Sequence, residues 1–228
     1  MSKPAGKQNF FINRRERWGL TFYGWLFLIL LFAGCLYAGF RSLYGVLSPV
    51  EREQSKVLVL EGFVNDYVLQ DAIREFKDNG DTLLVITGAP LEYGALLSQY
   101  RNTATIAAMS MIKLGFDSTK LVILTTDDLR NERTYNAALK LKQWLATQRP
   151  GIRAVNLMTM SVHGGRSRLL FRKALGDSVK VGIISVPNFY FGPGTWWKSS
   201  KGFRETMNEA IGYFYIRFFF HPRYPVGK

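Results

Sequence analysis

Cysteine and histidine are scarce in this chain of 228 residues, which has one cysteine, Cys35, and two histidines, His163 and His221. A single cysteine excludes an internal disulfide framework and a zinc cluster built on several thiolates. Two histidines are too few for most histidine-based metal sites. If a metal binds, oxygen ligands would hold it, which makes magnesium the candidate ion and leaves the cofactor unknown.

The sequence also lacks the motifs of several common reactions. It contains no Gly-x-Ser-x-Gly nucleophile elbow, no P-loop and no complete Gly-x-Gly-x-x-Gly fingerprint. These absences argue against serine hydrolases with a nucleophile elbow, P-loop nucleoside triphosphatases and dinucleotide-dependent dehydrogenases. They leave open whether the chain is an enzyme.

What the chain does contain is a long apolar run without a charge, from Trp18 to Phe40. At about 1.5 Å per residue, a helix of this length crosses a hydrocarbon core of roughly 30 Å. Five basic residues precede the run with Glu16 as the only acid, namely Lys3, Lys7, Arg14, Arg15 and Arg17. The positive-inside rule therefore predicts a cytoplasmic N-terminus and an extracytoplasmic C-terminal part.

Other interpretations of this run fit less well. It exceeds the apolar core of a signal peptide, about 7–15 residues, and no Ala-x-Ala site follows it. FAGC, which ends at Cys35, resembles a loose lipobox, but the chain stays apolar beyond it. We predict one uncleaved span in the cytoplasmic (inner) membrane, with lipidation of Cys35 or a buried soluble helix as the alternatives. The predicted organisation is a basic cytoplasmic segment over 1–17, a transmembrane helix over 18–43, a linker over 44–55 and an α/β domain over 56–228.

Beyond the linker, short apolar runs alternate with helical patterns. The runs at 57–60, 82–87, 121–124, 154–160 and 179–186 predict strands, and helical patterns at 64–76, 103–114, 137–145 and 169–175 separate them. In the second helix, Ile106, Met109 and Ile112 are expected to face the core. The alternation predicts an α/β fold with a mostly parallel sheet and helices on both faces.

In such sheets ligands bind at the carboxyl ends of the strands, so the residues that follow each strand are the candidates. Arg166 and Arg168 are predicted in the first turn of a helix, where two cations oppose the helix dipole unless an anion binds between them. The alternative is that both arginines point into solvent and that the preceding glycines only turn the chain. His163 is a candidate acid, base or phosphate donor.

Glu61 is the acidic residue most expected to face the cleft, where it could bind magnesium, act as a base or accept a hydrogen bond from a sugar hydroxyl. Alternatively, it pairs with Arg133 or Arg166. In the acidic loop after the third strand, which includes Asp127 and Asp128, only Arg133 and Thr134 are favoured as site residues. Glu209 is expected to pair with an arginine of the cleft.

Several motifs, in this order, carry a family resemblance: VLVLEG (57–62), VITGA (85–89), RTYNAA (133–138), the set Thr159, His163 and Arg166, and WWKSSKGFRETMNEAIG (196–212). Together they resemble the YdcF/SanA/ElyC domain family of bacterial envelope proteins. The resemblance implies a membrane-anchored, Rossmann-like three-layer sandwich that acts in cell-envelope biogenesis. The chain departs from the family pattern at three points. Glu61 stands where the family has glycine, and NTA around Thr103 replaces an acidic residue that the family often has. Asn136 and Ala137 stand where the family has Glu and Asn, so the Asn has either slipped by one position or been lost.

Three functions follow as alternatives. The first is binding of a phosphorylated or nucleotide-like ligand, the second is hydrolysis or transfer on a phosphorylated, lipid-linked envelope precursor, and the third is a non-catalytic scaffold. The expected catalytic pair is His163 with Glu61, and the expected ligand-binding residues are Gly62, Gly88, Arg133, Thr134, Asn136, Arg166, Arg168 and Glu209.

The net charge of +13 bears on the partners. Outside the membrane, a basic surface suits anionic lipid headgroups or an anionic small ligand rather than nucleic acid, unless it is merely solvated. The aromatic stretch at 212–220 predicts either the inner face of the last helix or a patch that rests on the membrane.

Overall fold

A computed structural model describes residues 20–92, 94, 96–126 and 132–221. The predicted basic segment 1–17, the first residues of the predicted span, and Asp127 and Asp128 lie outside these ranges. The chain divides into two compact units, Met1–Arg41 and Ser42–Lys228.

The described part of the first unit is helical. Helix α1 (Phe22–Leu47) begins here, and its last residues, Ser42–Leu47, belong to the second unit. The helix is long and apolar enough to cross a membrane, and its large side chains from Phe22 to Phe40 are exposed. The predicted N-terminal apolar helix is therefore present.

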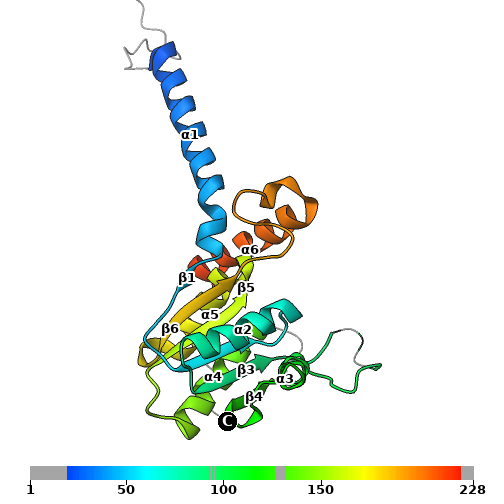
Figure 1. Cartoon of the computed structure of the whole chain (residues 1–228). Helices are drawn as coiled ribbons and strands as arrows, with labels where there is room; N and C mark the ends of the chain where they lie inside the picture. The colour runs from blue at the N-terminus through cyan, green and yellow to red at the C-terminus, as the bar shows by residue number, and fades with distance from the viewer. Residues whose placement is uncertain (1–19, 93, 95, 127–131, 222–228) are drawn as a thin grey trace, which may run out of the picture. The chain divides into compact units, whose positions relative to one another are not determined.

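The second unit is an α/β domain built on one six-stranded sheet (Figure 1). Its strands are β1 (Val50–Glu51), β2 (Val57–Glu61), β3 (Leu83–Gly88), β4 (Leu121–Thr125), β5 (Ala154–Met160) and β6 (Lys180–Val186). The order across the sheet is β1-β6-β5-β2-β3-β4, and every pairing is parallel except that of β1 with β6. The predicted fold class, α/β with a mostly parallel sheet, is confirmed.

Strand β1 lies inside the segment predicted as a linker, 44–55. The strand has only two residues, too few to show the alternating pattern by which strands are predicted from sequence. The chain beside it is fixed by Asn156 of β5, whose Oδ1 accepts a hydrogen bond from Glu53 N at 2.8 Å and whose Nδ2 donates to Glu53 O at 3.1 Å. The linker therefore joins the sheet through a side chain that is distant in sequence.

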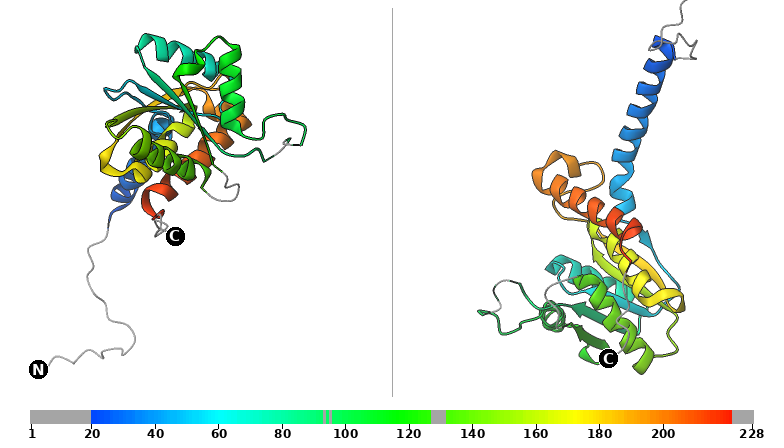
Figure 2. Two further views of the ribbon diagram at one scale, coloured as in Figure 1. Left: turned by 90° about the horizontal axis from the view of Figure 1, so that it is seen from below. Right: turned by 180° about the vertical axis from the view of Figure 1, so that it is seen from behind.

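Helices cover both faces of the sheet (Figure 2). They are α2 (Asp66–Asp78), α3 (Thr103–Lys113), α4 (Arg133–Gln148), α5 (Gly164–Leu175) and α6 (Ser200–Phe218), with 3-10 turns η1 (Ser118–Lys120), η2 (Ser161–His163), η3 (Gly176–Ser178) and η4 (Trp196–Lys198). Because alternate side chains of a strand point to opposite faces, Leu58 and Leu60 pack with α2 and α3, whereas Val57 and Val59 pack with α4 and α5.

The inward face of α3 differs from the prediction. It consists of small side chains and one methionine: Ala104, Ala107, Ala108 and Met111. Ile106 and Met109 are only partly buried and Ile112 is exposed, so the prediction for these three was wrong. At the start of α3, the backbone of Ala104 comes so close to the ends of β2 and β3 that a Cβ added to Gly62 or Gly88 would lie less than 3 Å from it.

Helix α5 begins earlier than the predicted 169–175, because the two glycines expected to form a turn are its first residues. A Cβ on Gly164 would collide with Ser185 Oγ of β6, and one on Gly165 would lie 2.8 Å from Val46 O. The glycines thus allow the helix to lie against both the sheet and the last turn of α1.

Candidate functional site

The candidate site lies where the path of the chain reverses across the sheet. From β2 the chain moves outward through β3 to β4, and it then returns to β5 on the other side of β2 and continues to β6. In open α/β sheets, ligands bind in the crevice outside the carboxyl ends of the strands at such a reversal. Glu61 is the last residue of β2, and His163 follows β5 through η2.

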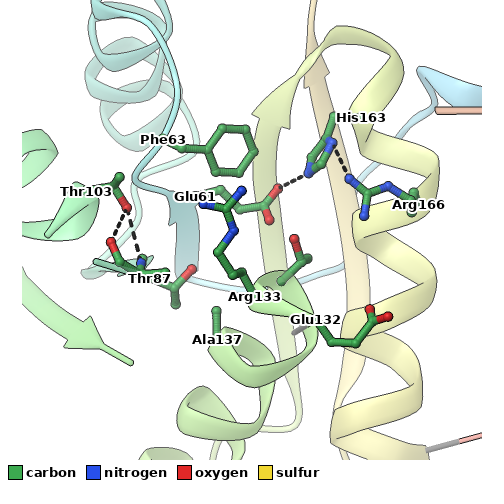
Figure 3. A pocket seen from close by; sticks show the side chains of 12 residues that line it. Glu61, Phe63, Thr87, Thr103, Glu132, Arg133, Ala137, His163 and Arg166 are labelled. Atoms are coloured by element: carbon green, nitrogen blue, oxygen red, sulfur yellow. Dashed lines mark hydrogen bonds and ion pairs between the residues drawn. The ribbon is translucent and has the colours of Figure 1, made fainter. Parts of the chain in front are cut away.

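A cavity of about 340 Å³ opens at this point, within the usual size range of small-molecule sites (Figure 3). It is lined by residues that follow β2, β3 and β5 and by residues at the starts of α3, α4 and α5: Glu61, Phe63, Thr87, Gly88, Ala89, Thr103, Glu132, Arg133, Thr134, Ala137, His163 and Arg166. Segments that are far apart in sequence therefore converge on it.

One wall is a hydrogen-bonded cluster of His163, Arg166 and Glu209. Arg166 Nε donates to Glu209 Oε2 at 2.7 Å, and Arg166 Nη2 donates to Glu209 Oε1 at 3.2 Å. His163 Nδ1 lies 2.9 Å from Glu209 Oε1. The carboxylate of Glu209 on α6 thus holds both cavity side chains from behind, as the expected pairing of Glu209 with an arginine requires.

The tautomer of His163 follows from these contacts. Nδ1 also lies 3.1 Å from Arg166 Nη2, but an arginine can only donate and a carboxylate can only accept, so Nδ1 cannot serve both. The bond to Glu209 is shorter and involves a carboxylate, which favours a proton on Nδ1. In the neutral ring, Nε2 then carries the lone pair. This atom is buried and has no hydrogen-bond partner in the described structure.

Glu61 stands on the other side of the imidazole ring and is nearly fully buried. Its Oε2 accepts a hydrogen bond from Ser167 Oγ at 2.7 Å and lies 3.8 Å from His163 Nε2, which is too long for a hydrogen bond. Glu61 pairs with neither Arg133 nor Arg166, contrary to the alternative considered from sequence. His163 Nε2 therefore lies beside the carboxylate of Glu61 without a hydrogen bond to it.

The position of His163 depends on a left-handed residue at the end of β5. Ser161 has φ of 50°, a conformation that costs a non-glycine residue free energy. Its hydroxyl lies 3.1 Å from the hydroxyl of Tyr44, which helps to hold it there. The turn sends the chain directly from the strand into α5, so that His163 and Arg166 face the cavity together.

Glu209 has a strongly lowered pKa. Burial alone would raise the pKa of its carboxyl group, but the hydrogen bonds and charges of His163 and Arg166 outweigh burial and lower the pKa to about 2. Burial alone would lower the pKa of Arg166, but the hydrogen bond and the negative charge of Glu209 outweigh burial and raise it. Both groups therefore stay charged at neutral pH.

This lowered pKa predicts a loss of stability in acid. Because the pKa of Glu209 in the folded state lies below the ordinary value of 4.5, its contribution is complete above about pH 4.5 and is lost as the pH falls toward about 2. The contribution is at most about 3 kcal/mol, at 1.36 kcal/mol per pH unit.

Urea unfolding of the full-length protein in detergent micelles should therefore show a stability difference between wild type and Glu209→Gln that shrinks from pH 6 to pH 2.5. The matched control is Glu205→Gln on the same helix, whose difference from wild type should change little. A Glu209→Gln difference that is constant with pH would contradict the prediction.

The opposite wall is the start of α4. Arg133 and Thr134 line the cavity, and Arg133 Nη1 forms a half-exposed ion pair with Glu92 at 3.0 Å. Such a pair contributes little to stability, so the guanidinium can exchange Glu92 for a ligand at little cost. Two arginines from two helices therefore face one cavity, which suits an anion that accepts bidentate hydrogen bonds.

The floor of the cavity depends on glycine. The start of α3 lies so close to Gly62 and Gly88 that a Cβ on either would collide with Thr103 or Ala104. Thr103 Oγ1 in turn bonds to the backbone of Ala89. These contacts hold the first residues of α3 at the ends of β2 and β3.

Comparison with protein-family models and with curated proteins gives no match. The interpretation of the site therefore depends on its geometry. Within the described ranges no three His, Cys, Asp or Glu side chains lie together in a way that could hold a metal ion. Glu61 accepts a hydrogen bond from Ser167, and Glu209 accepts hydrogen bonds from Arg166.

The structure places most of the predicted site residues at this cavity. Glu61, Gly88, Arg133, Thr134, His163 and Arg166 line it. Glu209 lies directly behind His163 and Arg166, and Gly62 lies beneath α3. The other two residues do not line the cavity: Arg168 Nη2 pairs with Glu51 of β1 at 2.6 Å, and Asn136 is a partly buried residue of α4.

Sequence reasoning missed several lining residues, among them Phe63, Thr87 and Thr103. Thr87 could have been found, because it ends a predicted strand. Its hydroxyl is buried without a hydrogen-bond partner in the described structure. Phe63, whose ring packs edge-on to His163 at 4.9 Å, and Ser167, which bonds to Glu61, carry no sequence signal of this role.

Proposed function

We propose that this chain is a membrane-anchored protein of cell-envelope biogenesis whose extracytoplasmic domain, a Rossmann-like three-layer sandwich, binds a phosphorylated or nucleotide-like ligand. Helix α1 would be the single span in the inner membrane, with the N-terminus in the cytoplasm. The envelope role rests on the order of family-like motifs from VLVLEG to WWKSSKGFRETMNEAIG. The ligand class rests on the cavity.

The observation that carries the ligand class is the pair of arginines facing one cavity at the reversal point of the sheet. Arg166 is fixed by Glu209, so its remaining donor capacity is already oriented before a ligand arrives. Among the described residues, Arg133 is held by a half-exposed ion pair with Glu92. A phosphoryl group accepts bidentate hydrogen bonds from guanidinium groups, and buried Thr87 supplies a further hydroxyl.

Arg133→Ala should therefore weaken ligand binding without damaging the fold. A hydrogen bond to a charged group contributes about 1.5–3 kcal/mol, which corresponds to a loss of affinity of roughly tenfold to a hundredfold. We would titrate the full-length protein in micelles with inorganic phosphate, a nucleoside monophosphate and a sugar phosphate by calorimetry. Lys140→Ala on the same helix is the matched control, and its affinities should equal those of the wild type.

Two outcomes would contradict the proposal: no binding of any of the three probes by the wild type, which would favour a non-catalytic scaffold, or equal affinities for Arg133→Ala and wild type. The same titrations, repeated with magnesium, test whether the ligand binds with a metal ion.

A second candidate function, hydrolysis or transfer on a phosphorylated, lipid-linked precursor, is favoured by His163. Glu209 orients the ring through Nδ1, and Nε2 is left buried and without a hydrogen-bond partner beside Glu61. An oriented imidazole with a free Nε2 can take a proton from an attacking water or hydroxyl. Release of inorganic phosphate or of a product during incubation with the same probes would distinguish an enzyme from a binding protein.

A further inference from the structure

Helix α6 exposes a stripe of large apolar side chains that the cavity does not use. Phe203, Ile211, Phe214 and Phe218 are 45–66% exposed. Scattered apolar residues are normal on protein surfaces, but a contiguous exposed stripe marks an interaction surface. The stretch 212–220 is therefore not simply the inner face of the last helix.

The stripe continues a buried contact with the end of α1. Phe203, Met207, Ala210 and Phe214 are spaced by four, three and four residues, so they share one face of α6. In the middle of this face, Met207 and Ala210 pack in a cluster with Tyr44 and Leu47. Phe203 and Phe214 extend the face on either side of that contact and are exposed.

Connectivity places this face near the membrane if α1 is the span. The first unit ends at Arg41 and the second begins at Ser42. Tyr44 is therefore only three residues beyond the end of the first unit. Three residues of fully extended chain reach at most about 11 Å, so connectivity alone keeps Tyr44 within that distance of the last residue of the first unit.

The charged residues near the stripe are mostly basic, which indicates the kind of surface that it contacts. From 198 to 219 the residues outside the His163 cluster include four cations, Lys198, Lys201, Arg204 and Arg217, and one acid, Glu205. A second copy of this chain on the same face would bring like charges together. A membrane surface with anionic headgroups instead attracts them and accepts aromatic side chains at its interface.

We propose that the exposed stripe of α6, Phe203, Ile211, Phe214 and Phe218, rests in the headgroup region of the membrane into which α1 inserts. This second attachment fixes the orientation of the α/β domain on the lipid surface. It rests on membrane insertion of α1, which is part of the proposed function, and it is independent of the ligand. Because α6 also carries Glu209, the helix that contacts lipid is the helix that holds His163 and Arg166.

The test uses the full-length protein in nanodiscs of phosphatidylcholine and phosphatidylglycerol at one chain per disc. The variants Phe214→Cys and Phe218→Cys, in a Cys35→Ser background, carry an environment-sensitive fluorophore. The lipids carry nitroxide quenchers near the headgroup for these positions and in the acyl chain for Cys35, which lies inside the predicted span. Position 114 is the matched control, because Leu114 is similarly exposed but lies at the end of α3. The native Cys35, labelled in the wild type, reports the insertion of α1.

We expect quenching at 214 and 218, with a blue shift of the emission, and no quenching at 114. Quenching of the Cys35 label together with none at 214 and 218 would overturn this proposal and leave the membrane anchor intact, whereas an unquenched Cys35 label would overturn the anchor itself. Protection of 214 and 218 that appears only at two chains per disc would assign the stripe to a second copy and would also overturn the proposal.

Discussion

Glu209→Ala is expected to lower the free energy of unfolding by about 3 kcal/mol, the low end of the cost of breaking a buried pair, because Arg166 and Glu209 are partly buried and the change leaves the arginine unpaired. Arg166 would lose hydrogen bonds to both carboxylate oxygens, and His163 Nδ1 would lose its acceptor. The stem of Arg166 packs against α6 close to Gly212. Urea unfolding of the full-length protein in micelles, followed by tryptophan fluorescence, measures the change.

Glu205→Ala is the matched control for this variant. Glu205 lies on the same helix, one turn earlier, and its ion pair with Lys201 spans 3.9 Å at the surface. Its loss should cost less than about 1 kcal/mol. Glu209→Gln, which keeps one acceptor oxygen, should fall between the two. Equal costs for Glu209→Ala and Glu205→Ala would show that the cluster does not stabilise the fold.

The main elements of the fold were predictable from local patterns. Runs such as 154–160 and 121–124 are rich in apolar and β-branched residues, and each lies within one residue of an observed strand boundary. Their alternation with helices was enough to predict a mostly parallel sheet. In such a sheet a ligand site is expected at the carboxyl ends of the strands. Glu61, His163 and Arg166 were found because each follows a strand.

The parts that were missed depend on contacts between distant segments. The glycines at 164 and 165 suggested a turn, because nothing local shows that Ser185 and Val46 approach them. Strand β1 could not be predicted from local sequence. Glu53, just after it, is held by hydrogen bonds to the side chain of Asn156, which is about a hundred residues away. Arg168 looked like a site residue because it is close to Arg166 in sequence, but residues two apart on a helix do not face each other, and Arg168 pairs with Glu51 instead.

Gly62→Ala is expected to lower the free energy of unfolding of the domain by about 3 kcal/mol. This is the upper end of the usual cost of adding a group to a well-packed site. An added Cβ would lie 2.7 Å from Ala104 Cα and 2.9 Å from both Ala104 N and Thr103 O. These are backbone atoms of the first turn of α3, so a rotamer change cannot relieve the collision. The helix itself must move, and it carries Thr103 away from the cavity.

Two variants test whether this collision is the cause. Ala104→Gly should not rescue Gly62→Ala, because the colliding atoms belong to the backbone rather than to the methyl group of Ala104. Gly151→Ala, at a position where an added Cβ meets nothing within 4 Å, should change the free energy of unfolding by less than about 0.5 kcal/mol. Rescue by Ala104→Gly, or equal costs at 62 and 151, would show that the start of α3 is not held against β2 as described.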